Sequence, residues 1–144
     1  MTSGNLDLSA IACVSIATKS IDEILPAYTE GLGLDIVTDI QVSPRGFGLR
    51  WIELGHNGNV LFELMEPTGS DGPVAKFLER NPAGGVYQVR LKANDIDQAR
   101  EDFASRGLEV IRGRVVSGYP SVTWVHPRST GGVLLEILSQ DPAP

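Results

Sequence analysis

The sequence predicts an α+β fold in which two βαβββ modules lie in one chain and form a cup-shaped mixed sheet. Three observations predict it: the two halves of the chain copy each other, each half carries a helix-start pattern after a strand-like run, and the length suits one domain. With 144 residues, 42% of them hydrophobic, the chain is long enough for two small repeats that share a core. We therefore expect a single domain over residues 1–144.

The duplication appears when the sequence is aligned with itself. Residues 14–17 match residues 89–92 at a shift of 75, and residues 60–64 match residues 133–137 at a shift of 73. The two tryptophans, Trp51 and Trp124, are also related by a shift of 73. Such a small drift over about fifty residues indicates an internal repeat.

Each copy is expected to begin with a strand, at residues 11–17 and 85–93, where β-branched and apolar residues are frequent. Capping boxes then predict helices that run to about residues 30 and 105; they are Ser20 with Glu23 and Asp95 with Gln98. Pro26 lies inside the first helix and predicts an irregular turn, because it has no backbone N–H. Three more strands are expected in each copy, at residues 34–42, 47–54 and 59–66, and at residues 108–115, 120–127 and 132–139.

These elements divide the domain into a first module at residues 9–67, a linker at residues 68–84 with a short helix at residues 73–80, and a second module at residues 85–140. The helix of each module covers only one face of its sheet. We expect the uncovered faces of the two modules to enclose a shared hollow, which is the natural place for a ligand.

Composition excludes several classes of function. The net charge is −6, which argues against nucleic acid as a partner. No apolar run approaches the roughly 20 residues of a membrane span, and residues 1–7 lack the features of a signal peptide. Cys13 is the single cysteine, so neither an internal disulfide nor a four-cysteine zinc site is expected. We expect a cytoplasmic protein without membrane contact.

Strand alternation places two acids on the inward faces. Glu63 is flanked two residues away by Leu61 and Met65, and Glu136 lies in the corresponding strand of the second module. Because the repeat relates them, we expect the two carboxylates to face each other across a pseudo-twofold axis. Arg90 is expected on the same inward side, where its guanidinium would neutralise them. A purely structural buried ion pair is the alternative.

The chain resembles the vicinal oxygen chelate superfamily, which includes glyoxalases, bleomycin resistance proteins and dioxygenases, and within it most resembles methylmalonyl-CoA epimerases. The resemblance rests on residues 126–137 and on residues 61–67 followed by residues 73–78. It implies a homodimer and a divalent metal held by one residue from each of four strands. Those four positions fall on Cys13, Glu63, Gln88 and Glu136. The histidines usual in the epimerases are thus replaced at Cys13 and Gln88, and a carboxylate used there as a base would fall near Leu49.

A thiol and a neutral amide together suit no common divalent ion well, so we favour a site without a metal or other cofactor, with Arg90 as its electrostatic centre. A divalent metal on those four residues is the alternative. Two neighbouring carboxylates in a low-dielectric site suit proton transfer, and we assign Glu136 as the base and Glu63 as its partner. The side chains expected to line the substrate site are Cys13, Gln88, Trp51, Trp124, Tyr87 and Tyr119.

The sequence therefore favours a small enzyme of the epimerase, isomerase or lyase kind that transfers a proton next to a carbonyl. Its substrate would be a small molecule, either an acyl-CoA or another carbonyl compound. Two alternatives stay open: a non-catalytic protein that sequesters a small molecule, as resistance proteins of the superfamily do, and a metal-dependent methylmalonyl-CoA epimerase with unusual ligands.

Overall fold

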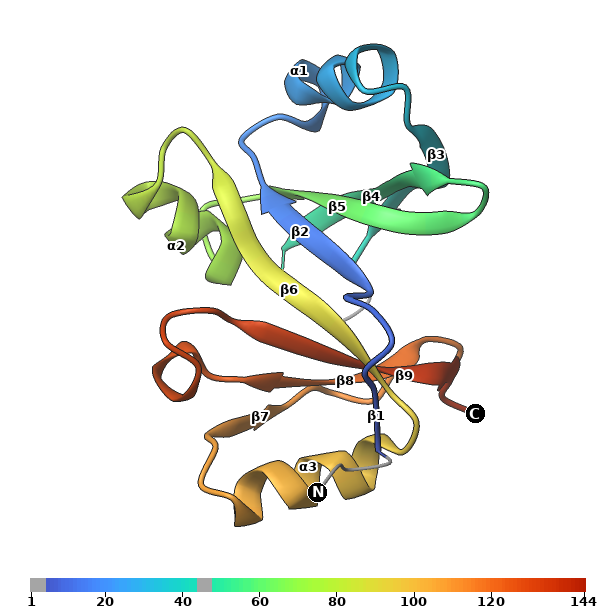
Figure 1. Cartoon of the computed structure of the whole chain (residues 1–144). Coiled ribbons are helices and arrows are strands. Elements are labelled where there is room, and N and C mark those ends of the chain that lie inside the picture. The colour runs from blue at the N-terminus through green and yellow to red at the C-terminus, as the bar shows by residue number, and fades with distance from the viewer. Residues whose placement is uncertain (1–4, 44–47) are drawn as a thin grey trace. The chain divides into compact units, whose positions relative to one another are not determined.

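The structure is a computed structural model that describes residues 5–43 and 48–144, and these divide into two compact units. The N-terminal unit is Cys13–Tyr87, and the C-terminal unit comprises residues 5–12 and Gln88–Pro144. Figure 1 shows the helices and strands of both units. Among the described residues, no helix is long and apolar enough to cross a lipid bilayer.

The sheet of the N-terminal unit has the strand order β3-β4-β5-β2. Strand β2 runs parallel to β5, whereas β4 is antiparallel to both β3 and β5. The elements of this unit are β2 (Cys13–Ala17), α1 (Ile21–Pro26), the π-helix η1 (Ala27–Gly31), β3 (Asp35–Val42), β4 (Leu49–His56), β5 (Asn59–Pro67) and α2 (Pro73–Arg80).

The C-terminal unit has the equivalent order β7-β8-β9-β6, with β6 parallel to β9 and the other pairs antiparallel. Its elements are β1 (Leu6–Asp7), β6 (Gly85–Ala93), α3 (Ile96–Ser105), β7 (Val110–Arg112), β8 (Pro120–Val125), the 3-10 helix η2 (Pro127–Ser129) and β9 (Leu135–Pro142). Strand β1 pairs with β6. The shared strand order confirms the predicted fold of paired βαβββ modules.

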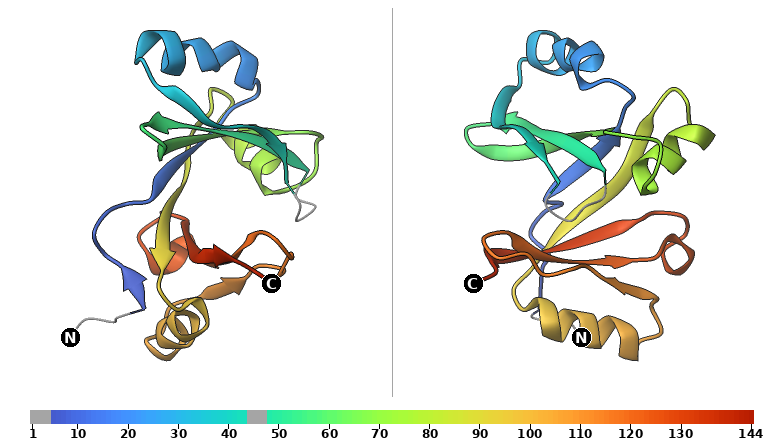
Figure 2. Two further views of the ribbon diagram at one scale, coloured as in Figure 1. Left: turned by 90° about the vertical axis from the view of Figure 1, so that its right-hand side faces the viewer. Right: turned by 180° about the vertical axis from the view of Figure 1, so that it is seen from behind.

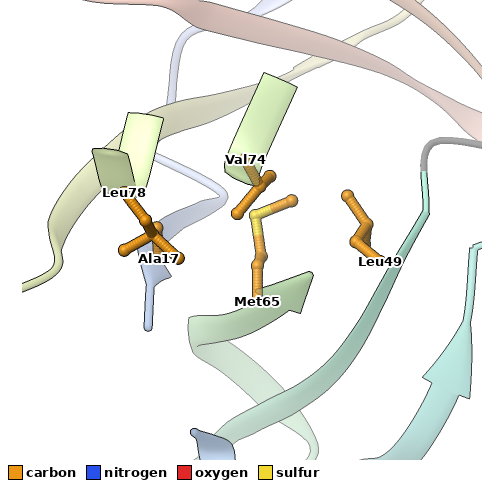
Figure 3. Close-up of a cluster of buried hydrophobic side chains, with 5 residues drawn as sticks. All are labelled: Ala17, Leu49, Met65, Val74 and Leu78. Atoms are coloured by element: carbon orange, nitrogen blue, oxygen red, sulfur yellow. The ribbon is translucent and has the colours of Figure 1, made fainter. Parts of the chain in front are cut away.

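Two helices cover opposite faces of the sheet in the N-terminal unit. Helix α1 lies over the face of β4 and β5 (Figure 2) that carries Ile52, Leu54 and Leu64, and its Ile21 packs among them. Because side chains alternate along a strand, the residues next to these three in the sequence point to the other face of the sheet. Helix α2 packs on that face through a cluster of buried side chains (Figure 3), which are Ala17, Leu49, Met65, Val74 and Leu78.

In the C-terminal unit, α3 covers one face of the sheet (Figure 2). Ala99 and Phe103 lie one helical turn apart and pack against Val125 and Ile137. The residues that alternate with these strand residues, including Arg90 and Glu136, therefore point to the opposite face of the sheet.

Local signals set the ends of the helices. Ser20 Oγ accepts the Glu23 N–H at 3.2 Å, and Asp95 Oδ1 accepts the Gln98 N–H at 3.1 Å, as the capping patterns predicted. The irregular turn expected at Pro26 is also confirmed, because α1 ends there and continues as the π-helix η1.

Several predicted strand limits were wrong. Strand β9 begins at Leu135 rather than residue 132, because Gly131 and Gly132 have φ values of +75° and +99° and cannot continue a strand. Strand β7 ends at Arg112 instead of residue 115. Strand β1 was not predicted, since two residues carry no periodic signal. Strand β4 runs two residues past the predicted end, and residue 47 at its predicted start lies outside the described residues.

Candidate active site

The glutamate of the N-terminal unit, Glu63, is buried and held by a hydroxyl group. Only 4% of the surface of Glu63 is exposed, and Ser15 on the neighbouring strand is completely buried. Ser15 Oγ donates a hydrogen bond to Glu63 Oε1 over 2.9 Å. Since a buried carboxylate is costly unless hydrogen-bonded, this contact helps to keep Glu63 inside the fold.

The glutamate of the C-terminal unit, Glu136, is held by a cation. Arg90 Nε donates to Glu136 Oε1 at 2.6 Å, and the two side chains are 10% and 11% exposed. A guanidinium–carboxylate bond of this length is charge-assisted and stronger than a bond between neutral groups. The unit therefore contains a buried ion pair rather than an isolated acid.

The same backbone geometry produces both contacts. Ser15 on β2 is the register partner of Glu63 on β5, and Arg90 on β6 is the register partner of Glu136 on β9. Both strand pairs are parallel, so register partners project to one side of their sheet. Both units therefore have a glutamate and a neighbouring donor at equivalent positions. The donor is a hydroxyl in the N-terminal unit and a guanidinium in the C-terminal unit.

A third acid, Glu53, was missed by the sequence analysis. It lies on β4 directly opposite Glu63 in the antiparallel register. Such cross-strand neighbours have Cβ atoms about 5 Å apart. The signal was present in the alternation of Leu49, Trp51 and Glu53, but only the register between the strands places Glu53 beside Glu63. The N-terminal unit thus brings two carboxylates and a serine hydroxyl onto one row.

In the C-terminal unit, the corresponding cross-strand neighbour is aromatic. Trp124 on β8 is the register partner of Glu136, whereas Trp51 on β4 is the register partner of Met65. The two tryptophans match in the sequence repeat, yet they take different places relative to the glutamates. Trp124 adds an indole to the row that contains Arg90 and Glu136.

The other expected lining residues lie in several environments. Cys13 and Gln88 are both 2% exposed, at or near the starts of β2 and β6. Trp51 and Tyr87 pack against the apolar cluster of α2, and the ring of Tyr87 meets that of Phe77 edge-on at 5.3 Å. The sixth expected residue, Tyr119, immediately precedes β8, and its backbone carbonyl accepts the Ala143 N–H.

The donor set fits a divalent metal poorly. The positions implied for a metal supply Cys13 and Glu63 from one unit and Gln88 and Glu136 from the other. A soft thiolate and a neutral amide favour different ions. Arg90 adds positive charge 2.6 Å from one oxygen of Glu136, which opposes a second cation at that carboxylate. Among the described residues, no cluster of three or more histidine, cysteine, aspartate or glutamate side chains could hold a metal.

What each unit offers chemically is a buried carboxylate beside a hydrogen-bond donor. In an apolar setting such a carboxylate can accept or return a proton, and a fixed cation can stabilise an oxyanion. These are the requirements for proton transfer next to a carbonyl group.

Comparisons with known proteins identify a family and similar sequences. The family model described as "Glyoxalase/Bleomycin resistance protein/Dioxygenase superfamily" matches residues 14–123. An ethylmalonyl-CoA/methylmalonyl-CoA epimerase of Cereibacter sphaeroides is 30% identical over 131 residues, which cover 86% of this chain and 92% of that protein. The mitochondrial methylmalonyl-CoA epimerase of Homo sapiens is 28% identical over 133 residues, covering 91% of this chain and 74% of that protein.

Solved structures give the same picture. The methylmalonyl-CoA epimerase of Mycobacterium tuberculosis superposes with a TM-score of 0.83 at 25% identity, covering 100% of this chain and 94% of that chain. A methylmalonyl-CoA epimerase in complex with methylmalonyl-CoA and NH4+ gives a TM-score of 0.80 at 26% identity, covering 96% of this chain and 100% of that chain.

Proposed function

We propose that the chain, which belongs to the glyoxalase/bleomycin resistance protein/dioxygenase superfamily, is an epimerase that moves a proton at the carbon next to the carbonyl of an acyl-CoA thioester. Similarity to enzymes named as ethylmalonyl-CoA and methylmalonyl-CoA epimerases supports this substrate class. The observation that carries the proposal is the buried glutamate on β5 and again on β9, each bonded to a donor on the adjacent parallel strand.

Epimerisation needs a base, a proton donor and a group that stabilises negative charge. Removal of the α-proton leaves an enolate, and return of a proton to the opposite face of that carbon inverts the configuration. We assign removal to Glu136 and return to Glu63, and we assign the enolate oxygen to the Arg90 guanidinium. A guanidinium has several N–H donors in one plane, which allows it to serve a carboxylate and an oxyanion together.

The proposed site works without a divalent metal. The positive charge of Arg90 next to Glu136 supports this, as does the mixed thiol and amide donor set of Cys13 and Gln88. A guanidinium supplies the charge that a metal would otherwise bring to the enolate oxygen.

Solvent exchange tests the function. Purified protein incubated with methylmalonyl-CoA or ethylmalonyl-CoA in D2O should incorporate deuterium at the α-carbon, as followed by mass spectrometry. Glu136→Gln and Glu63→Gln should each slow the exchange about 100-fold or more. Glu66→Gln is the matched control, because Glu66 also lies on β5 but pairs with Arg50 at 2.9 Å. Binding of these thioesters without exchange by the wild-type protein would instead support a sequestering role.

Metal analysis tests the cofactor proposal. We expect the purified protein to contain no stoichiometric divalent metal and to keep its exchange rate after dialysis against a chelator. Arg90→Met should slow exchange strongly, and Arg90→Lys, which retains the charge, should slow it less. Loss of exchange after chelation, with recovery on addition of one divalent ion, would establish the metal-dependent alternative.

The proposal includes the cellular location and the oligomeric state of the protein. We expect a cytoplasmic enzyme, in line with its single buried cysteine and its similarity to the bacterial enzyme of Cereibacter sphaeroides. The homodimer implied by the family resemblance can be tested by sedimentation equilibrium of the purified protein.

A further inference from the structure

Ser15 holds the Glu63 carboxylate from the adjacent parallel strand β2. The hydroxyl and the carboxylate oxygen are 2.9 Å apart, and the two residues are 0% and 4% exposed. A serine side chain has one heavy-atom rotamer angle, and complete burial fixes that angle by packing. The donor is therefore held rigidly, and the hydrogen bond transfers that rigidity to Glu63.

The neighbours of Ser15 show why this position matters. The residues two positions away on the same face of β2 are Cys13 and Ala17, which are 2% and 1% exposed and carry no hydroxyl. On the other side of Glu63, the register partner on β4 is Glu53. The Ser15 hydroxyl therefore holds Glu63 from the side of β2, and Glu53 lies on the strand at its other side.

The second unit offers an internal comparison. Arg90 takes the place of Ser15 in the register and makes the corresponding contact to Glu136. Each unit thus fixes its glutamate from the same point on the adjacent parallel strand. Recurrence of this contact in two units with different donors indicates that orientation of the acid, rather than one particular charge, is the shared requirement.

We propose that Ser15 is a positioning residue for proton transfer by Glu63, a role that rests on the proposed epimerase function. Ser15 holds one carboxylate oxygen and thereby sets the direction in which Glu63 offers its proton to the α-carbon. Ser15 does not bind substrate in this proposal, so its removal acts on the chemical step. A displacement of about 1 Å at a reacting group can slow catalysis about 100-fold.

The test compares kinetic constants for deuterium exchange into methylmalonyl-CoA. Ser15→Ala should lower kcat about 10- to 100-fold and leave KM within about twofold of wild type. Ser15→Thr keeps the hydroxyl and should retain most of the activity. Ser15→Cys introduces a thiol, which is close to the hydroxyl in size but is a weaker hydrogen-bond donor. Its rate should lie between those of the wild type and Ser15→Ala, and it provides a second test if the extra methyl group of threonine disturbs the packing.

Two controls separate positioning from folding. Ser139→Ala removes a strand serine that accepts the Ser121 N–H at 2.8 Å, and it should leave kcat unchanged. In a Glu63→Gln background, Ser15→Ala should cause no further loss, because the group it positions has been changed. Circular dichroism at the assay temperature confirms that each variant is folded.

Each result decides the proposal. The role of Ser15 alone would be overturned if the wild-type protein is active and Ser15→Ala does not slow it. It would also be overturned if Ser15→Ala slows the wild-type protein and the Glu63→Gln variant by the same factor. A wild-type protein that exchanges no α-proton would overturn the proposed function, and the positioning role with it. The two failures are therefore distinguishable from the wild-type rate.

Discussion

The two units share their strand order but differ in the row of side chains that crosses each sheet at the glutamate. In the N-terminal unit the row contains Ser15, Glu63 and Glu53. In the C-terminal unit it contains Arg90, Glu136 and Trp124. The first row combines two acids and a neutral donor, and the second combines an acid with a cation and an aromatic ring.

This difference shows which properties the fold fixes and which it leaves to the side chains. Parallel register places a donor next to the glutamate in both units, because register partners project to the same side. The chemical environment of each carboxylate then depends on single substitutions within the row. The charge also differs between the units, since residues 13–87 carry 5 basic and 10 acidic side chains, and the rest of the chain carries 7 and 8.

The hairpins explain why the rows differ. Strands β4 and β5 are joined by the two-residue turn Asn57 and Gly58, with φ values of +51° and +78° as in a type I′ turn. Strands β8 and β9 are joined by a longer connection that contains η2. Relative to the sequence repeat, the register of β8 against β9 is shifted by two residues from that of β4 against β5. An even slip keeps every side chain on its original face, so Trp124 replaces an acid as the neighbour of the glutamate.

The largest expected effect concerns the donors of the two glutamates. Arg90→Met should lower the free energy of unfolding by about 3–5 kcal/mol, because Glu136 would lose its ion-pair partner while buried. Ser15→Ala should cost about 1–3 kcal/mol, because it removes one hydrogen bond to a carboxylate. Urea unfolding at neutral pH measures both changes.

The double variant Arg90→Met with Glu136→Met serves as the control for that comparison. Replacing both charges should recover most of the lost stability, since no unpaired charge is left inside the unit. Equal losses for Arg90→Met and Ser15→Ala would contradict the distinction between a charged and a neutral donor.

The next largest effect compares the loss of stability at a glycine beside the tight β4–β5 turn with that at a glycine in the longer β8–β9 connection. A Cβ atom at Gly55 would collide with the backbone carbonyl of Asn59, so Gly55→Ala should cost about 3 kcal/mol. Gly131→Ala has open space around the new methyl group but needs a φ of +75°, which costs about 1–2 kcal/mol. Thermal unfolding ranks the two variants. A smaller loss at Gly55 than at Gly131 would mean that the β4–β5 hairpin tolerates a shift in register.

Much of this arrangement could be predicted from sequence because it depends on local periodicity. Alternation along a strand was enough to predict that Glu63 and Glu136 point inward, and both are buried, although Leu61, which was expected on the same face as Glu63, is 46% exposed. The helix starts at Ser20 and Asp95 could be read from side chains within three residues of each other.

The rest depends on contacts between strands that no local pattern encodes. Glu53 becomes a neighbour of Glu63 through the register that the Asn57–Gly58 turn sets. The start of β9 depends on the positive φ angles of two glycines rather than on the apolar run that follows them. Whether Glu63 and Glu136 face each other is a question about how two units are placed, and it stays a prediction.

The smallest expected effect compares the helix caps of the two units. Asp95→Ala should lower the free energy of unfolding by about 1 kcal/mol, because its carboxylate accepts the Gln98 N–H and also interacts with the dipole of α3. Ser20→Ala should cost less. The start of α1 keeps a second acceptor, since Glu66 Oε1 accepts the Ile21 N–H at 2.7 Å. In a Glu66→Met background, which has no oxygen acceptor for the Ile21 N–H, the loss caused by Ser20→Ala should rise towards that of Asp95→Ala. Added salt should reduce only the Asp95 effect. Equal losses for the two single variants in urea unfolding would show that Glu66 adds nothing to the cap of α1.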